Sequence, residues 1–330
     1  MKGLIAAIAL SFFTTMAQAQ DEVSVLFIGN SFTFMNDMPF MFRDIAIAKG
    51  KKVHVDTVVE GGKNFEYHSK NPETYELIKS RKWDYIVIQG QSNELAQPES
   101  KIDLNSFPYA KKIVDSIREN SSCTQLVLYM TWGYKYGNPK WAPIASYDSM
   151  QARIQNQYLR FADLLDARIS PVGEVWRNVR KNNSGLNLYD ADNQHPNLAG
   201  SYLSACTFYT SIFGESPYMN GSKNVLDLPS RHIIELTASQ VVLNRLNEWR
   251  FVPKSSPLEP GFDLYQNGNE VHLRNTAKNE EWMEWNFGDG HLSVEQDAIH
   301  TFQKPGTYTI TQKVSNPCKT VSLERKIEVK

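Results

Sequence analysis

This chain of 330 residues contains few cysteines and has a small net charge. Its three cysteines are too few and too scattered for a disulfide scaffold of the kind that holds small secreted domains together. They form no Cys/His cluster with zinc-finger spacing, and we expect neither a metal nor another cofactor. The formal net charge is only −1, so no broad positive field exists to attract nucleic acid. A nucleic-acid partner is therefore not expected.

Long apolar runs are also rare. One lies at residues 4–13, between Lys2 and the small-residue pattern Ala-Gln-Ala at residues 17–19. This order is typical of a secretory signal peptide over residues 1–19, and no cysteine follows it to carry a lipid anchor. We therefore expect a secreted or periplasmic protein. No later segment approaches the roughly 18 apolar residues of a membrane-spanning helix, so membrane insertion is not expected.

Strand-like and helix-like segments alternate over residues 20–250, which is typical of a parallel sheet covered by helices. Strands are expected at residues 23–28, 53–59, 85–88, 126–130 and 169–172. Helices are expected at residues 39–49, 72–82, 107–119, 145–166, 198–213 and 231–249. The pattern predicts an α/β domain with a five-stranded parallel sheet.

The composition changes after residue 250. Residues 251–261 are rich in proline and serine, which predicts a linker. Residues 262–330 then show short alternating stretches separated by turn residues. We expect a small all-β sandwich at the C-terminus.

The chemistry is indicated first by residues 23–33, an apolar run that breaks at Gly-Asn and presents Ser31. A serine hydroxyl is a poor nucleophile at neutral pH, so it needs an imidazole base and a group that orients the imidazole. His195 and Asp192 are three positions apart, so one short loop can carry both. We predict that Ser31, His195 and Asp192 form the catalytic set, with Asp190 as the alternative carboxylate.

Acyl transfer also needs hydrogen-bond donors directed at the developing oxyanion. Turns that contain Gly62, Gln91 and Asn93 follow the second and third expected strands, and ligands bind at such strand ends in open α/β sheets. We expect the backbone N–H groups of Ser31 and Gly62 to form this oxyanion hole. A side-chain amide completes it, from either Asn93 or Gln91.

Taken in order, these blocks resemble those of the SGNH (GDSL-like) hydrolases. The nucleophile block is Gly-Asn-Ser at residues 29–31, and the D-x-x-H block is at residues 192–195. Gly62 and Asn93 stand for the second and third blocks. The resemblance covers about residues 23–215 and implies a three-layer, flavodoxin-like fold and a serine esterase that needs no cofactor.

The third block departs from the family pattern. Gln91 stands where the family usually has glycine. The surrounding Gly-Gln-Ser-Asn also resembles the nucleophile block of sialate and xylan acetylesterases, which makes Ser92 a competing nucleophile. We favour Ser31, because it follows the first expected strand, whereas Ser92 follows the third.

The expected substrate class is inferred from the loop after the fourth expected strand. Residues 131–141 contain four large aromatic side chains, among them Trp132 and Tyr134. Such rings combine a flat apolar face with a polar tip, which suits a hydroxylated sugar ring. We expect Trp132 and Tyr134 to bind carbohydrate, with His68 lining the same pocket. The alternative is that these residues only fix a long loop.

The C-terminal region has a resemblance of its own. Trp-Asn-Phe-Gly-Asp-Gly at residues 285–290, followed by residues 299–302 and 306–310, is similar to a PKD domain. This resemblance implies an immunoglobulin-like sandwich that acts as a spacer or contacts polysaccharide or other proteins. The sequence thus predicts a secreted esterase that removes acetyl or another small acyl group from a glycan. The alternatives are a lipase- or thioesterase-like hydrolase and a non-catalytic glycan-binding protein.

Overall fold

The computed structural model describes residues 22–219, 226–251 and 258–330. The expected signal peptide and most of the expected linker lie outside the described residues. The described residues form two compact units, one over residues 22–251 and the other over residues 258–330. Within the described residues, none of the helices is long and apolar enough to cross a membrane.

The first unit contains the predicted five-stranded parallel sheet. Its strands have the order β2-β1-β3-β4-β5, which is the flavodoxin-like order. The strands are β1 (Val23–Gly29), β2 (Val53–Val59), β3 (Tyr85–Ile88), β4 (Gln125–Tyr129) and β5 (Arg168–Ser170). β1 is buried along nearly its whole length, because helices cover both faces of the sheet. The predicted α/β fold class is confirmed.

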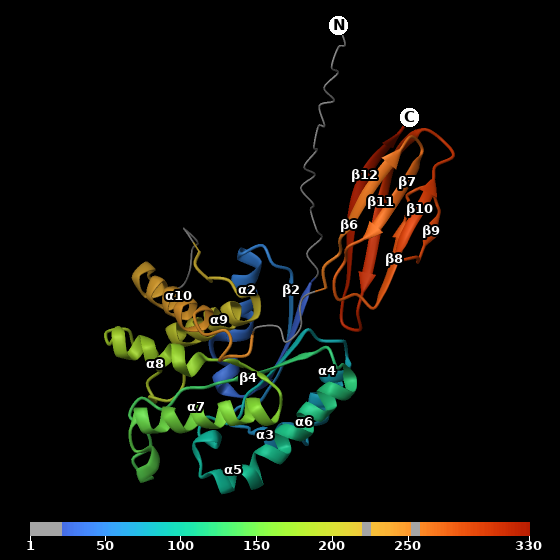
Figure 1. The fold of residues 1–330 in the computed structure, drawn as a ribbon. Coiled ribbons are helices and arrows are strands. Elements are labelled where there is room, and N and C mark those ends of the chain that lie inside the picture. Colours follow the sequence, from blue (N-terminus) through green and yellow to red (C-terminus); the bar gives the residue numbers. More distant parts are fainter. Residues whose placement is uncertain (1–21, 220–225, 252–257) are drawn as a thin grey trace. The chain divides into compact units, whose positions relative to one another are not determined.

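Helices form a layer on each side of this sheet (Figure 1), with α2 and α9 packed together on one side and α4 and α6 on the other. The longer helices are α2 (Met38–Ala48), α4 (Pro72–Lys79), α6 (Phe107–Asn120), α7 (Tyr147–Leu164), α8 (Val172–Asn182), α9 (Leu198–Phe213) and α10 (Leu228–Leu243). The short helices are α1 (Ser31–Phe34), α3 (Phe65–His68) and α5 (Glu99–Asn105).

Helix α8 lies where the sequence pattern indicated only the end of a strand. The expected strand at residues 169–172 ends at Ser170, and α8 begins at Val172. Val172, Val175 and Val179 are buried at helical spacing, so the apolar periodicity was there to be found. α8 brings Trp176 beneath the site described below.

The second unit is the predicted small β-sandwich, built from two antiparallel sheets with the orders β10-β7-β6 and β12-β11-β8-β9. Its strands are β6 (Phe262–Asn267), β7 (Glu270–Asn275), β8 (Trp282–Asn286), β9 (Leu292–Ser293), β10 (Asp297–Thr301), β11 (Gly306–Ser315) and β12 (Thr320–Val329). Trp285 is fully buried between the sheets and packs edge-on against Phe262, with ring centroids 5.1 Å apart. The sandwich therefore has a core of its own.

Candidate active site

Ser31 lies where the chain leaves β1 and enters α1. The side-chain oxygen of Asn30 accepts a hydrogen bond from the N–H of Phe32 at 3.1 Å and so caps this short helix. A side chain at Gly29 would collide with Thr33, since a Cβ there would lie 2.4 Å from Thr33 Oγ1. Gly29 and Asn30 therefore place Ser31 at the carboxyl end of β1, between β2 and β3.

Asn30 also joins the serine turn to the two neighbouring loops. Its backbone N–H donates to the buried Gln89 Oε1 at 3.0 Å, and its side-chain Nδ2 donates to the carbonyl of Lys63 at 2.8 Å. Gln89 follows β3, and Lys63 follows the Gly62 turn after β2. The three loops that carry Ser31, Gly62 and the Gln91–Asn93 turn are thus hydrogen-bonded to one another.

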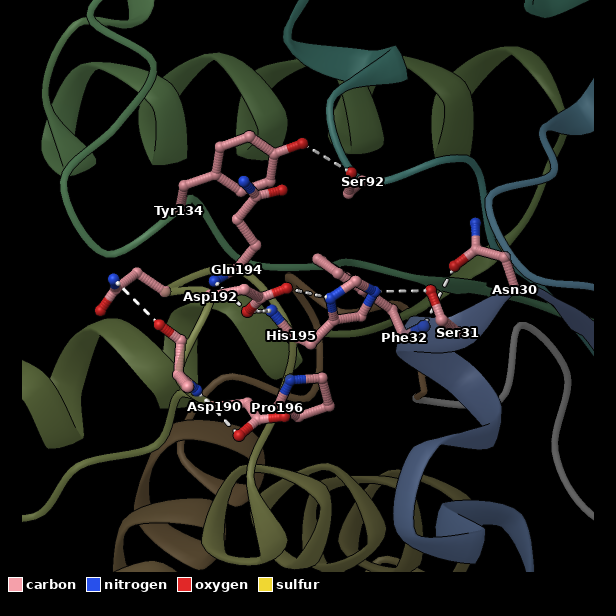
Figure 2. A network of polar contacts seen from close by, with 12 residues as sticks. Asn30, Ser31, Phe32, Ser92, Tyr134, Asp190, Asp192, Gln194, His195 and Pro196 are labelled. Carbon is pink, nitrogen blue, oxygen red and sulfur yellow. Dashed lines mark hydrogen bonds and ion pairs between the residues drawn. The ribbon is translucent and has the colours of Figure 1, made fainter.

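The side chains of Ser31, His195 and Asp192 form one hydrogen-bonded row (Figure 2). Ser31 Oγ lies 2.8 Å from His195 Nε2, and His195 Nδ1 lies 2.5 Å from Asp192 Oδ2. With its proton on Nδ1, the imidazole donates to Asp192 and can accept the proton of Ser31. The structure brings together the three residues that the sequence predicted for catalysis.

Asp192 is held in place by its second carboxylate oxygen. Oδ1 accepts the backbone N–H groups of Gln194 and His195, both at 2.9 Å. Burial would raise the pKa of Asp192, but the hydrogen bonds from the His195 ring and from these two N–H groups outweigh it and lower the pKa. Asp192 is therefore a carboxylate at neutral pH.

Asp190, the alternative carboxylate, does not contact the imidazole. Its Oδ1 accepts the N–H of Ala191 at 2.8 Å, and its own N–H donates to the carbonyl of His195 at 2.9 Å. The loop is closed by an antiparallel bridge between Tyr189 and Pro196. Asp190 thus shapes the loop that presents Asp192 and His195.

An aromatic stack supports the His195 ring. Phe32 packs edge-on against the imidazole, with centroids 5.4 Å apart. The Phe32 ring also stacks on Trp132, with centroids 4.6 Å apart. Trp132 stacks in turn on Trp176 at 3.9 Å and donates from Nε1 to the carbonyl of Gln194 at 3.0 Å. Trp132 therefore fixes the loop that carries Asp192 and His195 from within the core.

The structure corrects two of the expected substrate contacts, because both side chains are buried. Trp132 and His68 are both 0% exposed, so neither offers a surface to a substrate in this structure. His68 donates from Nε2 to the carbonyl of Gly29 at 2.9 Å and supports the end of β1. Burial lowers the pKa of His68, because it disfavours the charged imidazolium.

Tyr134 and Ser92 form a pair beside the catalytic row (Figure 2). The Tyr134 hydroxyl lies 2.8 Å from Ser92 Oγ, and the Gln91 side-chain amide donates to the same Ser92 oxygen at 2.7 Å. Ser92 is only 8% exposed and meets a phenol and an amide instead of an imidazole. Among the described residues, Ser92 therefore meets no imidazole of the kind that Ser31 meets. Tyr134 is only 9% exposed, so it offers little surface to a substrate.

Three of the four predicted oxyanion donors, Gly62, Gln91 and Asn93, line one pocket of about 250 Å³, whereas Ser31 is not among its lining residues. The remaining lining residues are Asn64, Glu94, Gln97, Lys101, Ile102, Asn105 and Ser106. Glu94 is buried behind the turn and accepts the N–H of Gln91 at 2.9 Å. Its burial raises its pKa to about 7. Most of the lining residues have polar or charged side chains, but more of the exposed lining surface is apolar than polar.

Several residues that organise the site were not singled out from the sequence. Asn30 and Gln89 connect the loops, and Phe32 and Trp176 support the imidazole through ring contacts. The positions of Asn30 and Gln89, directly after strands β1 and β3, were the available signal. The ring stack has no such signal, because it joins α1, α8 and the loop after β4.

Comparison with known proteins identifies the C-terminal region. Residues 263–329 match the model of the PKD domain family. This confirms the predicted resemblance and agrees with the observed sandwich of antiparallel sheets.

The α/β unit resembles solved structures. One is a DUF4886 family protein from Bacteroides uniformis ATCC 8492, with a TM-score of 0.60, 22% identity, and coverage of 68% of this chain and 95% of that chain. Another is a candidate SGNH hydrolase from Slackia heliotrinireducens, with a TM-score of 0.47, 26% identity, and coverage of 57% of this chain and 98% of that chain.

A curated protein with sequence similarity is a homoserine dehydrogenase from Paracoccidioides brasiliensis (strain Pb18). It is 23% identical over an alignment of 185 residues. The match covers 53% of this chain and 48% of that protein, so this chain spans about half the length of the curated protein that it matches. The turn after β1 reads Gly-Asn-Ser at residues 29–31 and lacks the G-x-G-x-x-G fingerprint of dinucleotide-binding folds.

This chain joins an α/β unit with the fold of the Bacteroides uniformis protein to a C-terminal PKD domain.

Proposed function

We propose that this protein is a serine ester hydrolase of the SGNH type. The observation that carries the proposal is the hydrogen-bonded row of Ser31, His195 and Asp192 at the carboxyl end of β1. A nucleophile, a base and an orienting carboxylate within direct hydrogen-bond reach are what acyl transfer requires.

The reaction follows from this row. Ser31 Oγ attacks the ester carbonyl while His195 Nε2 takes its proton, and the resulting imidazolium is stabilised by Asp192. The tetrahedral intermediate collapses, and His195 returns the proton to the leaving alcohol. Water, deprotonated by His195, then attacks the acyl-enzyme, and His195 returns this proton to Ser31 Oγ as the acid leaves.

The side-chain amide of Asn93 is our choice for the oxyanion hole, beside the N–H groups of Ser31 and Gly62. Gln91 already uses both ends of its amide within the turn, because Oε1 accepts the N–H of Asn93 at 3.1 Å and Nε2 donates to Ser92. Both residues line the pocket, but the Gln91 amide is engaged within the turn, so we assign the donor role to Asn93.

Replacing Asn93 with alanine tests this choice. Loss of one oxyanion donor lowers kcat by about 10²- to 10³-fold, because the donor acts mainly on the transition state. We expect Asn93→Ala to show this loss in steady-state kinetics with a soluble acetyl ester, and Gln91→Ala to show a smaller one. A larger loss in Gln91→Ala than in Asn93→Ala would reverse the assignment.

The pocket favours a short acyl group on a hydroxylated alcohol as the substrate. Amide, hydroxyl and charged side chains line it, with Ile102 as the sole aliphatic side chain among the lining residues. A long acyl chain needs an extended apolar surface, and a pocket of about 250 Å³ with one aliphatic side chain in its lining is small for such a chain. Together with the expected export and the PKD domain, this composition supports an esterase that deacetylates a glycan outside the cytoplasm.

Acetate release from a panel of acetylated polysaccharides tests the substrate class, with esters of long-chain fatty acids as the comparison. We expect acetyl esters to be cleaved with the higher kcat/KM. A preference for long-chain esters would favour a lipase- or thioesterase-like enzyme. Glycan binding without cleavage of any ester would favour a non-catalytic binding protein.

A further inference from the structure

The PKD domain gathers one carboxylate and two imidazoles at one end of its sandwich. Asp289 and His291 lie in the turn between β8 and β9, and His300 lies in β10. Asp289 Oδ2 is 2.7 Å from His300 Nε2, and Asp289 Oδ1 is 3.2 Å from His291 Nδ1. One ligand atom from each of the three residues lies within 4.8 Å of the others.

Features of the backbone hold the turn in this shape. Gly288 has a φ of +82°, and a Cβ there would lie 2.6 Å from the carbonyl oxygen of Thr309, so no other residue fits. Phe287 donates its N–H to the carbonyl of His291 at 3.2 Å, which closes the turn. The turn therefore presents Asp289 and His291 together, independently of any ligand.

Ring packing fixes the third group. His300 stacks on Phe287 with centroids 4.1 Å apart and meets Phe302 edge-on at 4.7 Å. Its side chain is 12% exposed, whereas that of His291 is 67% exposed. One side of the cluster is thus rigid and shielded, and the other is open to an entering ion and to water.

We infer that Asp289, His291 and His300 form a binding site for a Zn²⁺-type transition-metal ion. Two imidazole nitrogens and one carboxylate oxygen are ligands that Zn²⁺ accepts, with a water in the fourth position. Bonds of about 2.0–2.1 Å in a tetrahedron place neighbouring ligand atoms roughly 3.3 Å apart. The 3.2 Å between Asp289 Oδ1 and His291 Nδ1 is close to this separation, whereas the 2.7 Å between Asp289 Oδ2 and His300 Nε2 is a hydrogen-bond distance that would lengthen when an ion binds. Ca²⁺ and Mg²⁺ prefer oxygen ligands and are disfavoured.

A bound ion would tie the turn between β8 and β9 to β10. Each imidazole would bind through the nitrogen that now faces Asp289, with its proton on the other ring nitrogen. The zinc-spacing patterns sought in the sequence rely on ligand pairs close along the chain. Such patterns do not reveal this site, because His300 is brought to Asp289 and His291 only by the fold. The inference does not depend on the proposed esterase activity.

The same domain contains a matched control. On β7, His272 Nε2 lies 2.8 Å from Glu270 Oε1, and both side chains are about half exposed. This pair has the same histidine–carboxylate chemistry. Among the described residues, however, it does not belong to a cluster of three candidate metal ligands. His272→Ala therefore removes an exposed histidine without touching the proposed site.

Calorimetric titration of the full chain with Zn²⁺ alone, after treatment with a chelator, tests the site. We expect His291→Ala to lose one equivalent of bound Zn²⁺ or to bind it at least about tenfold more weakly. His272→Ala should bind Zn²⁺ as the wild type does. Asp289→Asn preserves the shape of the side chain and should reproduce the loss, with folding checked by circular dichroism.

Identical Zn²⁺ titrations of the wild type and His291→Ala would overturn the inference. The cluster would then be a hydrogen-bonded structural contact. A titration with Ca²⁺ should show no dependence on His291 or Asp289, and Ca²⁺ binding that is lost in Asp289→Asn while Zn²⁺ binding is retained would also overturn it.

Discussion

Ser31→Ala should abolish ester hydrolysis, with kcat reduced by about 10⁴- to 10⁶-fold, the scale seen when serine hydrolases lose their nucleophile. The variant keeps the Asn30 cap and the contacts of Gln89, none of which involve the serine hydroxyl. It should therefore fold like the wild type, with an unchanged thermal unfolding temperature. The measurement is the steady-state rate with a small acetyl ester.

Ser92→Ala is the matched control for this experiment. Ser92 also follows a strand of the sheet and stands in a polar turn, but its hydroxyl contacts Tyr134 and Gln91. Its removal should alter kcat far less than the removal of Ser31. If Ser31→Ala retained turnover while Ser92→Ala lost it, the nucleophile would be Ser92 and the proposed mechanism would be wrong.

The sheet and the catalytic row could be predicted because their signals are local. Each strand is a short apolar run, and β1 was expected at residues 23–28 and observed at Val23–Gly29. Asp192 and His195 are close along the chain, so their shared loop was visible in the sequence. The carboxyl ends of parallel strands lie at one edge of the sheet, so Ser31, which follows β1, lies at the edge where this loop is found.

The roles of the buried aromatic and histidine residues could not be predicted in the same way. Trp132 and His68 were expected at the substrate, since the ring types suit sugar binding. Whether a ring faces solvent or the core depends on packing between segments far apart in the sequence. Trp132 packs on Phe32 of α1 and Trp176 of α8, and this contact sets its burial.

Replacing Asp192 with asparagine should lower kcat by about 10⁴-fold, a loss of the size seen for the equivalent change in a serine protease. The carboxylate accepts the proton on His195 Nδ1 and so fixes the tautomer whose Nε2 can accept from Ser31. An asparagine amide facing Nδ1 donates instead. The proton then moves to Nε2, and the imidazole can no longer act as the base.

Folding should survive this change, since asparagine keeps a carbonyl oxygen to accept the N–H groups of Gln194 and His195. Asp190→Asn is the control, because it neutralises a carboxylate in the same loop that does not contact the imidazole. We expect its kcat to stay within a few-fold of the wild type in the same assay. Equal losses in Asp190→Asn and Asp192→Asn would mean that the loop's charge or shape matters and that Asp192 does not act through the tautomer of His195.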